Sequence, residues 1–152
     1  MGGIRYNSTS SYNPWANIYI YNDFCLLNKK GIINSLTINH DAISKDLLLT
    51  FRLTNNRIDS INHNYNFAKY HLYLKRNNVI TSPKFFISHP PLKVETPHLN
   101  YDGSICLYHP DFYQWEEYDS IIEPIFKWLY FWVYFYETWL IFGKWYGPEI
   151  KH

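Results

Sequence analysis

The sequence predicts an α+β domain in which an antiparallel sheet is followed by a long aromatic helix. Segments at residues 47–54, 70–75 and 84–88 alternate apolar and polar side chains with the two-residue period of half-buried strands. Short connections between consecutive strands favour an antiparallel meander. Residues 125–142, in contrast, are apolar almost throughout. We therefore expect a single domain over residues 1–152, with a loose terminus at residues 1–13.

The segments that flank these strands are less clearly patterned. Residues 14–27 are rich in apolar side chains, and their spacing fits either a helix or a strand. Residues 32–43 are mixed, and Asn39, His40 and Asp41 predict a turn within them. Pro90 and Pro91 follow the last strand, and neither can donate to a ladder, so we expect the sheet to end before them.

The C-terminal helix has recognisable start and stop signals. Asp119 or Ser120 can cap it, Pro124 fits its first turn, and Gly143 is a good left-handed cap at its end. The helix is too apolar for a single buried stripe, because aromatic residues also lie off that stripe. Two interpretations stay open: a core helix that backs the sheet, or an aromatic surface that binds a partner. The residues assigned to such a surface are Trp128, Phe131 and Phe135.

Composition excludes several classes of protein. The net charge of +1 and the lack of a basic run argue against nucleic-acid binding. Two cysteines without a secretory leader favour a reducing cytoplasm, and Lys127 and Glu137 interrupt the only stretch apolar enough for a membrane span. His98, Cys106 and His109 are possible zinc ligands, with His89 or His152 as a fourth. That spacing matches no zinc motif, so we expect no metal and no cofactor.

Cys106 is the candidate nucleophile. His98 and His109 stand near it in the sequence, and Asp102 and Gly103 form a tight turn just before it. A nearby base or cation raises the thiolate fraction of a cysteine. The alternative is a buried, inert cysteine, because free cysteine is among the most buried residue types. Cys25 lies among apolar residues and is predicted to belong to the core.

Residues 96–107 read TPHLNYDGSICL and resemble the active-site segment of ubiquitin-conjugating enzymes. In that family a His-Pro-Asn triplet precedes Gly-x-Ile-Cys-Leu, and a tryptophan follows. The matching residues are Pro97, Gly103, Cys106 and Trp115. Thr96 and His98 depart from the pattern, because they stand where the family has histidine and asparagine. A closer resemblance is to the stand-alone conjugating-enzyme-like protein of short type II CBASS antiphage operons, which also has a Gly-x-Trp-x-Gly ending, found here at residues 143–147.

This resemblance implies a ubiquitin-conjugating-enzyme-like fold: a helix over residues 14–27, an antiparallel meander, an extended crossover that carries Cys106, and the aromatic C-terminal helix. Cys106 would accept an acyl group as a thioester and pass it to an amine or another thiol. His98 would donate a hydrogen bond to the oxyanion, or alternatively only pin its loop. Neighbours expected around this active site are Tyr101, Asp102, Gly103, Tyr108, His109 and His152.

The resemblance also implies a partner. This would be the cyclic-oligonucleotide synthase, a nucleotidyltransferase, of the same bacterial operon, and its C-terminal carboxylate would supply the acyl group. A non-catalytic adaptor that binds and regulates the synthase is the alternative function. A homodimer is a further way to cover the aromatic helix.

The tail after the helix is expected to be ordered. Trp145 is large and apolar, and such a side chain is costly to leave exposed. A bend at Pro148 and Glu149 can return His152 toward the domain and toward Cys106.

Overall fold

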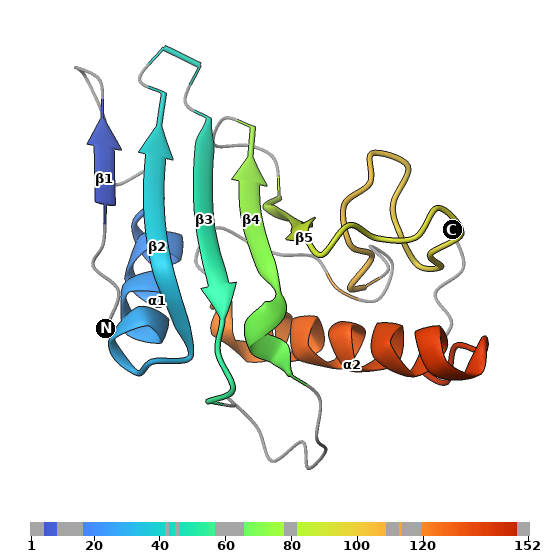
Figure 1. Cartoon of the computed structure of the whole chain (residues 1–152). Helices are drawn as coiled ribbons and strands as arrows, with labels where there is room; N and C mark the ends of the chain where they lie inside the picture. Colours follow the sequence, from blue (N-terminus) through green and yellow to red (C-terminus); the bar gives the residue numbers. More distant parts are fainter. Residues whose placement is uncertain are drawn as a thin grey trace.

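The computed structural model describes residues 5–8, 17–41, 43–44, 46–56, 66–77, 82–108, 113 and 120–148. Within these residues, a five-stranded sheet has the order β1-β2-β3-β4-β5 (Figure 1). The main elements are β1 (Arg5–Ser8), α1 (Ile18–Lys29), β2 (Ile33–His40), β3 (Leu47–Leu53), β4 (His71–Arg76), β5 (Lys84–His89) and α2 (Lys127–Phe142). Strands β2 to β5 pair antiparallel in sequence order, which confirms the predicted meander.

The predicted strands β3, β4 and β5 lie close to their expected positions. Along β3, buried and half-buried residues alternate from Leu47 to Leu53, and β4 begins at His71, one residue after the expected start. Phe51 lies at the centre of the buried face. The centroid of its ring lies 5.1 Å from that of Phe24 on α1 and 6.0 Å from that of Phe126, just before α2. The two helices therefore cover the same face of the sheet, and their aromatic rings form the core.

The structure resolves the ambiguous segment at residues 14–27 for its described part. Ile18–Lys29 forms α1, whose buried side chains Ile20, Phe24 and Leu27 recur at helical spacing. Gly31 follows the helix with a φ of 72°, which a side chain would disfavour. Cys25 lies half-buried on this helix, and burial raises the pKa of its thiol.

Two expectations for the N-terminal third of the chain differ from the structure. Arg5–Ser8, expected to be loose, forms β1 and pairs in parallel with β2; the rest of residues 1–13 lies outside the described residues. Asn39 and His40, predicted as a turn, continue β2 and pair with Leu48 and Leu47 of β3. The chain turns after Asp41 instead, because ladder pairing outweighs local turn preference. The Asp41 carboxylate then accepts a 2.9 Å hydrogen bond from the backbone N–H of Ile43.

The start of α2 also differs from the prediction. The Ser120 hydroxyl accepts a 3.0 Å hydrogen bond from the backbone N–H of Ile122, as a capping residue should, whereas Asp119 lies outside the described residues. Glu123, however, has an extended backbone at φ −127° and ψ 120°. A residue before proline is sterically disfavoured in the helical region, so Pro124 lies in a separate turn and α2 begins at Lys127.

The end of α2 agrees with the prediction. Gly143 has a φ of 71°, and its N–H donates to the carbonyl of Trp139 at 2.8 Å. In the part of the chain that the structure describes, no helix is both long and apolar enough to span a membrane.

Polar pairs also connect the layers. The buried hydroxyl of Tyr70 donates to Glu137 of α2 at 2.6 Å, and Lys69 forms an ion pair with the same carboxylate. Burial and the adjacent Glu137 raise the pKa of Tyr70 far above its ordinary value. Arg76 of β4 donates to the side-chain oxygen of Asn17 at 2.6 Å, immediately before α1. Both helices are therefore attached to the β4 region by polar contacts as well as by apolar packing.

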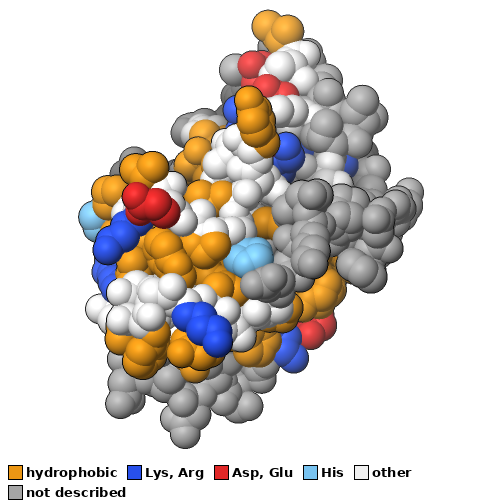
Figure 2. All heavy atoms as spheres, turned by 90° about the vertical axis from the view of Figure 1, so that its right-hand side faces the viewer, with side chains coloured by type: hydrophobic (Ala, Val, Ile, Leu, Met, Phe, Trp, Pro, Cys, Tyr) orange, Lys and Arg blue, Asp and Glu red, His pale blue; other side chains and the backbone are white. Residues whose placement is uncertain are grey.

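The far half of α2 extends past β5 and lies beside the crossover of residues 90–108 (Figure 1). The buried residues of α2 include Leu129, Trp132, Val133 and Tyr136, while Ile141 and Phe142 at its C-terminal end are exposed. Figure 2 views this side of the molecule and shows hydrophobic side chains gathered on the surface. The helix is thus a core helix whose C-terminal end is apolar and uncovered by the described residues.

Candidate active site

A tight reversal of the chain precedes Cys106. Leu99 and Ile105 form an antiparallel bridge, and the backbone N–H of Asn100 donates to the carbonyl of Ser104 at 2.8 Å. Within the loop, Gly103 donates to the carbonyl of Asn100 at 2.9 Å and has a φ of 88°, which requires glycine or costs strain. Residues 99–105 therefore form a small, defined turn, as the Asp-Gly pair predicts.

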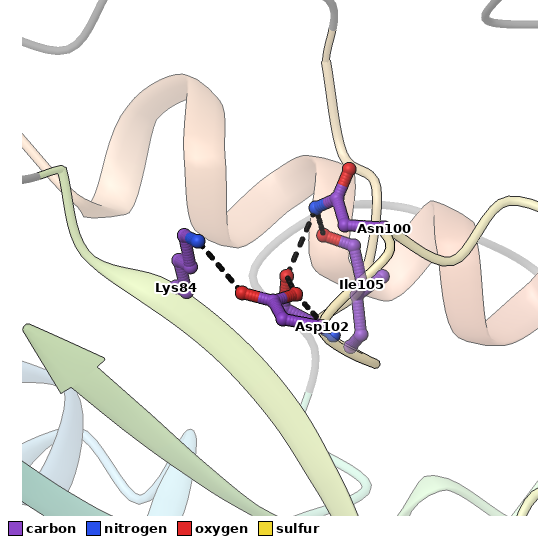
Figure 3. A network of polar contacts seen from close by, with 5 residues as sticks. Lys84, Asn100, Asp102 and Ile105 are labelled. Atoms are coloured by element: carbon purple, nitrogen blue, oxygen red, sulfur yellow. Dashed lines mark hydrogen bonds and ion pairs between the residues drawn. The ribbon is translucent and has the colours of Figure 1, made fainter. Parts of the chain in front are cut away.

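Asp102 anchors this turn to the sheet (Figure 3). One carboxylate oxygen accepts hydrogen bonds from the backbone N–H and the hydroxyl of Ser104, at 3.0 and 2.6 Å. The other accepts from the Lys84 ammonium of β5 at 2.6 Å. Burial opposes ionisation of Asp102, but the bonds from Lys84 and Ser104 prevail and lower its pKa to about 2. The carboxylate is thus ionised at neutral pH and holds the turn in place.

Two backbone hydrogen bonds fix the chain at Ile105 and Cys106. The N–H of the preceding Ile105 donates to the carbonyl of Phe85 on β5 at 2.8 Å, and the N–H of Cys106 donates to the carbonyl of His98 at 3.0 Å. The side chain is 2% exposed, and its sulfur lies 3.9 Å from the carbonyl oxygen of Tyr108. Burial raises the pKa of the Cys106 thiol. At neutral pH the sulfur is therefore held mainly as a thiol.

His98 lies beside Cys106 in an unusual backbone conformation, with a φ of 57°. Its carbonyl accepts hydrogen bonds from the Cys106 N–H and from the indole N–H of Trp132 on α2, the latter at 3.1 Å. Its ring contacts that of Trp145 in the tail, with centroids 4.7 Å apart and an angle of 41° between the planes. Thr96, in the place of the family's histidine, is buried and donates to the carbonyl of Lys93 at 2.5 Å, which is a structural contact.

An aromatic cluster lies next to Cys106 in the chain. The ring centroid of Tyr108 lies 5.1 Å from that of Tyr113 and 5.8 Å from that of Trp128. The centroids of Tyr113 and Trp128 are 5.3 Å apart. Burial, with a smaller effect of Tyr113, raises the pKa of Tyr108. Trp128, predicted to bind a partner, thus packs against aromatic residues of its own chain.

The other residues predicted to bind a partner are half-buried near the tail. The ring centroids of Phe131 and Phe135 are 6.5 Å apart, and that of Phe135 lies 6.0 Å from that of Trp145. A Cβ atom at Gly147 would come within 2.5 Å of the Phe135 ring, so the tail passes directly over it. The predicted order of the tail is therefore confirmed for residues 143–148, and a role of these aromatic residues in binding a partner remains a prediction.

Not every predicted active-site residue is brought to Cys106. Tyr101 lies at the tip of the turn and is fully exposed. His109, Trp115 and His152 lie outside the described residues. Across the described ranges, no group of three or more His, Cys, Asp or Glu side chains could hold a metal ion.

Several residues that hold the site in place are not predicted by the sequence. Lys84, Trp132 and Trp145 contact Asp102 or His98 but lie far from them in the chain. Asn100 and Ser104 were also missed, although they flank the Asp-Gly pair and their side chains hydrogen-bond at 3.0 Å. Polar residues around such a turn were the one local signal available.

An antiparallel meander, a long aromatic C-terminal helix and a cysteine on the crossover between them define a ubiquitin-conjugating-enzyme-like α+β protein. The model of the family described as Type II CBASS E2 protein matches residues 41–152, which include β3, the crossover, α2 and the tail. The chain belongs to this family and is therefore a CBASS-associated protein of the E2 type. None of the curated proteins compared with the chain matches it.

Proposed function

We propose that this protein accepts an acyl group on Cys106 as a thioester and transfers it to an amine or another thiol. The acyl group would come from the C-terminus of the cyclic-oligonucleotide synthase of the same operon, and the transfer would serve antiphage defence. The observation that supports this most directly is the placement of Cys106. It follows a tight turn, is hydrogen-bonded to His98 through the backbone, and lies within the residues matched to the family.

The proposed chemistry requires an activated acyl donor, such as a thioester. The Cys106 sulfur forms a bond to the acyl carbon, the bond from that carbon to the leaving sulfur breaks, and the thiol proton passes to the leaving thiolate. In the second step an amine attacks the acyl carbon and Cys106 leaves as the thiol. Imidazole donates a hydrogen bond in either neutral tautomer, so His98 can stabilise the oxyanion of both steps.

Burial of the thiol sets two conditions on this reaction. Because Cys106 is 2% exposed, a donor reaches the sulfur only when the site opens locally, and we assign this opening to binding of the partner. Because burial raises the thiol pKa, the thiolate is scarce at neutral pH. The rate of acylation should therefore rise as the pH is raised from about 7 to about 9, toward the ordinary range of cysteine.

The test is intact-mass spectrometry of the protein purified with its synthase, with and without reductant. We expect a reductant-labile adduct on Cys106 that is absent from Cys106→Ala and stable to reductant in Cys106→Ser, where it is an oxyester. Cys25→Ala is the matched control, because Cys25 is the other free thiol and lies on α1. An adduct that persists in Cys106→Ala, or undiminished phage protection by that variant, would exclude the proposed chemistry.

A non-catalytic adaptor is the second candidate, and the inaccessibility of Cys106 favours it. A buried thiol with a raised pKa is also what an inert core cysteine looks like. An adaptor with Cys106→Ala would still bind the synthase and alter its output. A transferase with the same substitution would bind the synthase and have no effect on its output.

A further inference from the structure

The C-terminal tail supplies an aromatic contact to His98, the residue next to the candidate nucleophile. We propose that Trp145 is a positioning residue that fixes the His98 ring for its action at Cys106. This inference rests on the proposed acyl transfer and adds to it a residue that does not touch the reacting atoms. Its basis is the contact between the two rings, together with the way each of them is held.

The backbone of His98 is fixed independently of its ring. Its carbonyl accepts the N–H of Cys106 at 3.0 Å and the indole N–H of Trp132 at 3.1 Å, so the crossover and α2 together set the direction of the Cα–Cβ bond. These bonds leave rotation about the side-chain torsions of His98 undetermined. A ring that is to donate one hydrogen bond in a defined direction needs these torsions to be restricted as well.

Trp145 provides such a restriction. Its ring centroid lies 4.7 Å from that of His98, which is close contact between two flat rings. An indole against one face of the imidazole blocks rotations that would carry the imidazole through that space. The same contact covers part of one face of the His98 ring.

Trp145 is itself held by α2 and the tail. Its ring lies 5.6 Å from Trp132 and 6.0 Å from Phe135, and Gly147 passes so close to Phe135 that a side chain there would clash. Its indole nitrogen is buried and has no hydrogen-bond partner among the described residues. The contacts described for Trp145 are therefore packing contacts, and a phenyl ring at this position should retain most of them.

Trp132 connects the two halves of this arrangement. The same side chain donates to the His98 carbonyl and packs against Trp145. The backbone and the ring of His98 are thus positioned by a single unit made of α2 and the tail. Loss of the Trp145 ring should leave the backbone bonds in place and remove the indole contact from the imidazole.

The test adds a synthetic peptide alkyl thioester, which copies the last residues of the synthase, to the protein bound to a synthase that lacks those residues, and measures single-turnover acylation of Cys106 by intact mass. Trp145→Ala should slow acylation by about ten- to hundredfold, because misplacement of a catalytic group by about 1 Å has an effect of that order. Trp145→Phe should restore most of the rate. Tyr146→Ala is the matched control, because Tyr146 is the adjacent tail aromatic and is 57% exposed; its rate should equal that of the wild type.

A double-mutant cycle separates positioning from a general structural role. If Trp145 acts through His98, the variant His98→Ala/Trp145→Ala should be acylated no more slowly than His98→Ala alone. Each of the two proteins with Trp145→Ala should nevertheless melt at a lower temperature than its counterpart that keeps Trp145. A rate loss that adds fully to that of His98→Ala would overturn the proposal, as would a wild-type rate in Trp145→Ala. Should Trp145→Ala not fold, Trp145→Leu fills the space without a flat ring and enters the same cycle. If the wild type itself forms no Cys106 adduct, the acyl transfer and this inference fail together. If the wild type is acylated, a fully additive rate loss or a wild-type rate in Trp145→Ala overturns the positioning role alone.

Discussion

His98 is a non-glycine residue in the left-handed region, with a φ of 57°. For most side chains this conformation costs about 1–2 kcal/mol, and asparagine tolerates it better than other residues do. Two hydrogen bonds to the His98 carbonyl offset the cost and keep the residue beside Cys106. An asparagine, the residue that ubiquitin-conjugating enzymes have here, suits both the backbone conformation and the role of hydrogen-bond donor.

We therefore expect His98→Asn to remain active within a few-fold, and His98→Ala to lose about a hundredfold in the rate of Cys106 acylation. Loss of one oxyanion donor typically has an effect of that size. The measurement is single-turnover acylation, with the melting temperature of each variant as a control for folding. An alanine variant almost as fast as the wild type would leave His98 with only the role of pinning its loop.

The charge of Asp102 should appear in the pH dependence of stability. Its pKa is lowered to about 2 in the folded protein, against about 3.9 in an unfolded chain. A depressed carboxyl pKa stabilises the fold fully above the unfolded value, and this stabilisation is lost as the pH falls through the folded value. The side chains of Lys84 and Asp102 are 55% and 38% exposed, so salt should weaken the effect.

Asp102→Asn isolates this charge, because asparagine keeps an oxygen that can accept from Ser104. The variant should unfold at lower denaturant concentration than the wild type above about pH 4, and the difference should shrink as the pH falls through about 2. Urea titrations of both proteins across this range provide the measurement. A difference that is independent of pH would mean that the ion pair with Lys84 does not stabilise the turn.

At the scale of elements, α2 and the tail act together. Gly143 ends the helix in a left-handed conformation, and the tail then turns back so that Trp145 packs against Trp132 and Phe135. The tail is thus packed against the same helix that holds the crossover. It lies close to the site because the helix extends past the sheet to the crossover.

Truncation after Gly143 should lower the melting temperature by several degrees, since it removes buried tryptophan contacts that contribute about 2 kcal/mol. Scanning calorimetry of the two proteins is the measurement. Truncation after Pro148 is the control, because it keeps the described part of the tail and should have a much smaller effect. Equal melting temperatures for the wild type and the protein truncated after Gly143 would show that the Trp145 contacts add no stability.

For the molecule as a whole, the apolar end of α2 is the feature that points outward. Ile141 and Phe142 are 62% and 64% exposed, and protein interfaces are enriched in aromatic residues. A synthase or a second copy of this chain are the two occupants expected for such a surface. Light scattering of the protein alone and of its mixture with the synthase distinguishes between them.

We expect the protein to co-purify with its operon's synthase, and deletion of the synthase's last residues to abolish the Cys106 adduct and change synthase output in cells. The reason is that those residues would carry the acyl group that reaches the thiol. A synthase with a scrambled tail of equal length controls for loss of binding area. If output is unaltered by the deletion and by Cys106→Ala, and the complex still forms, the adaptor function becomes the better explanation.

Much of this protein is determined by local pattern in its sequence. Strands β3, β4 and β5, the helix end at Gly143 and the Asp102-Gly103 turn depend on alternation or on single residues, and these signals act over a few neighbouring positions. The motif around Cys106 is local in the same way. It lies within residues 41–152, which the family model matches.

Other features were decided only by tertiary structure. Whether the segment before β2 is a helix depends on burial of Phe24 against Phe51, and the extension of β2 through His40 depends on pairing with β3. The contacts of Lys84 with Asp102 and of Trp145 with His98 join residues distant in the chain. Such contacts form only when the sheet, the crossover and the tail have packed together, and their partners are therefore not encoded in any short stretch of sequence.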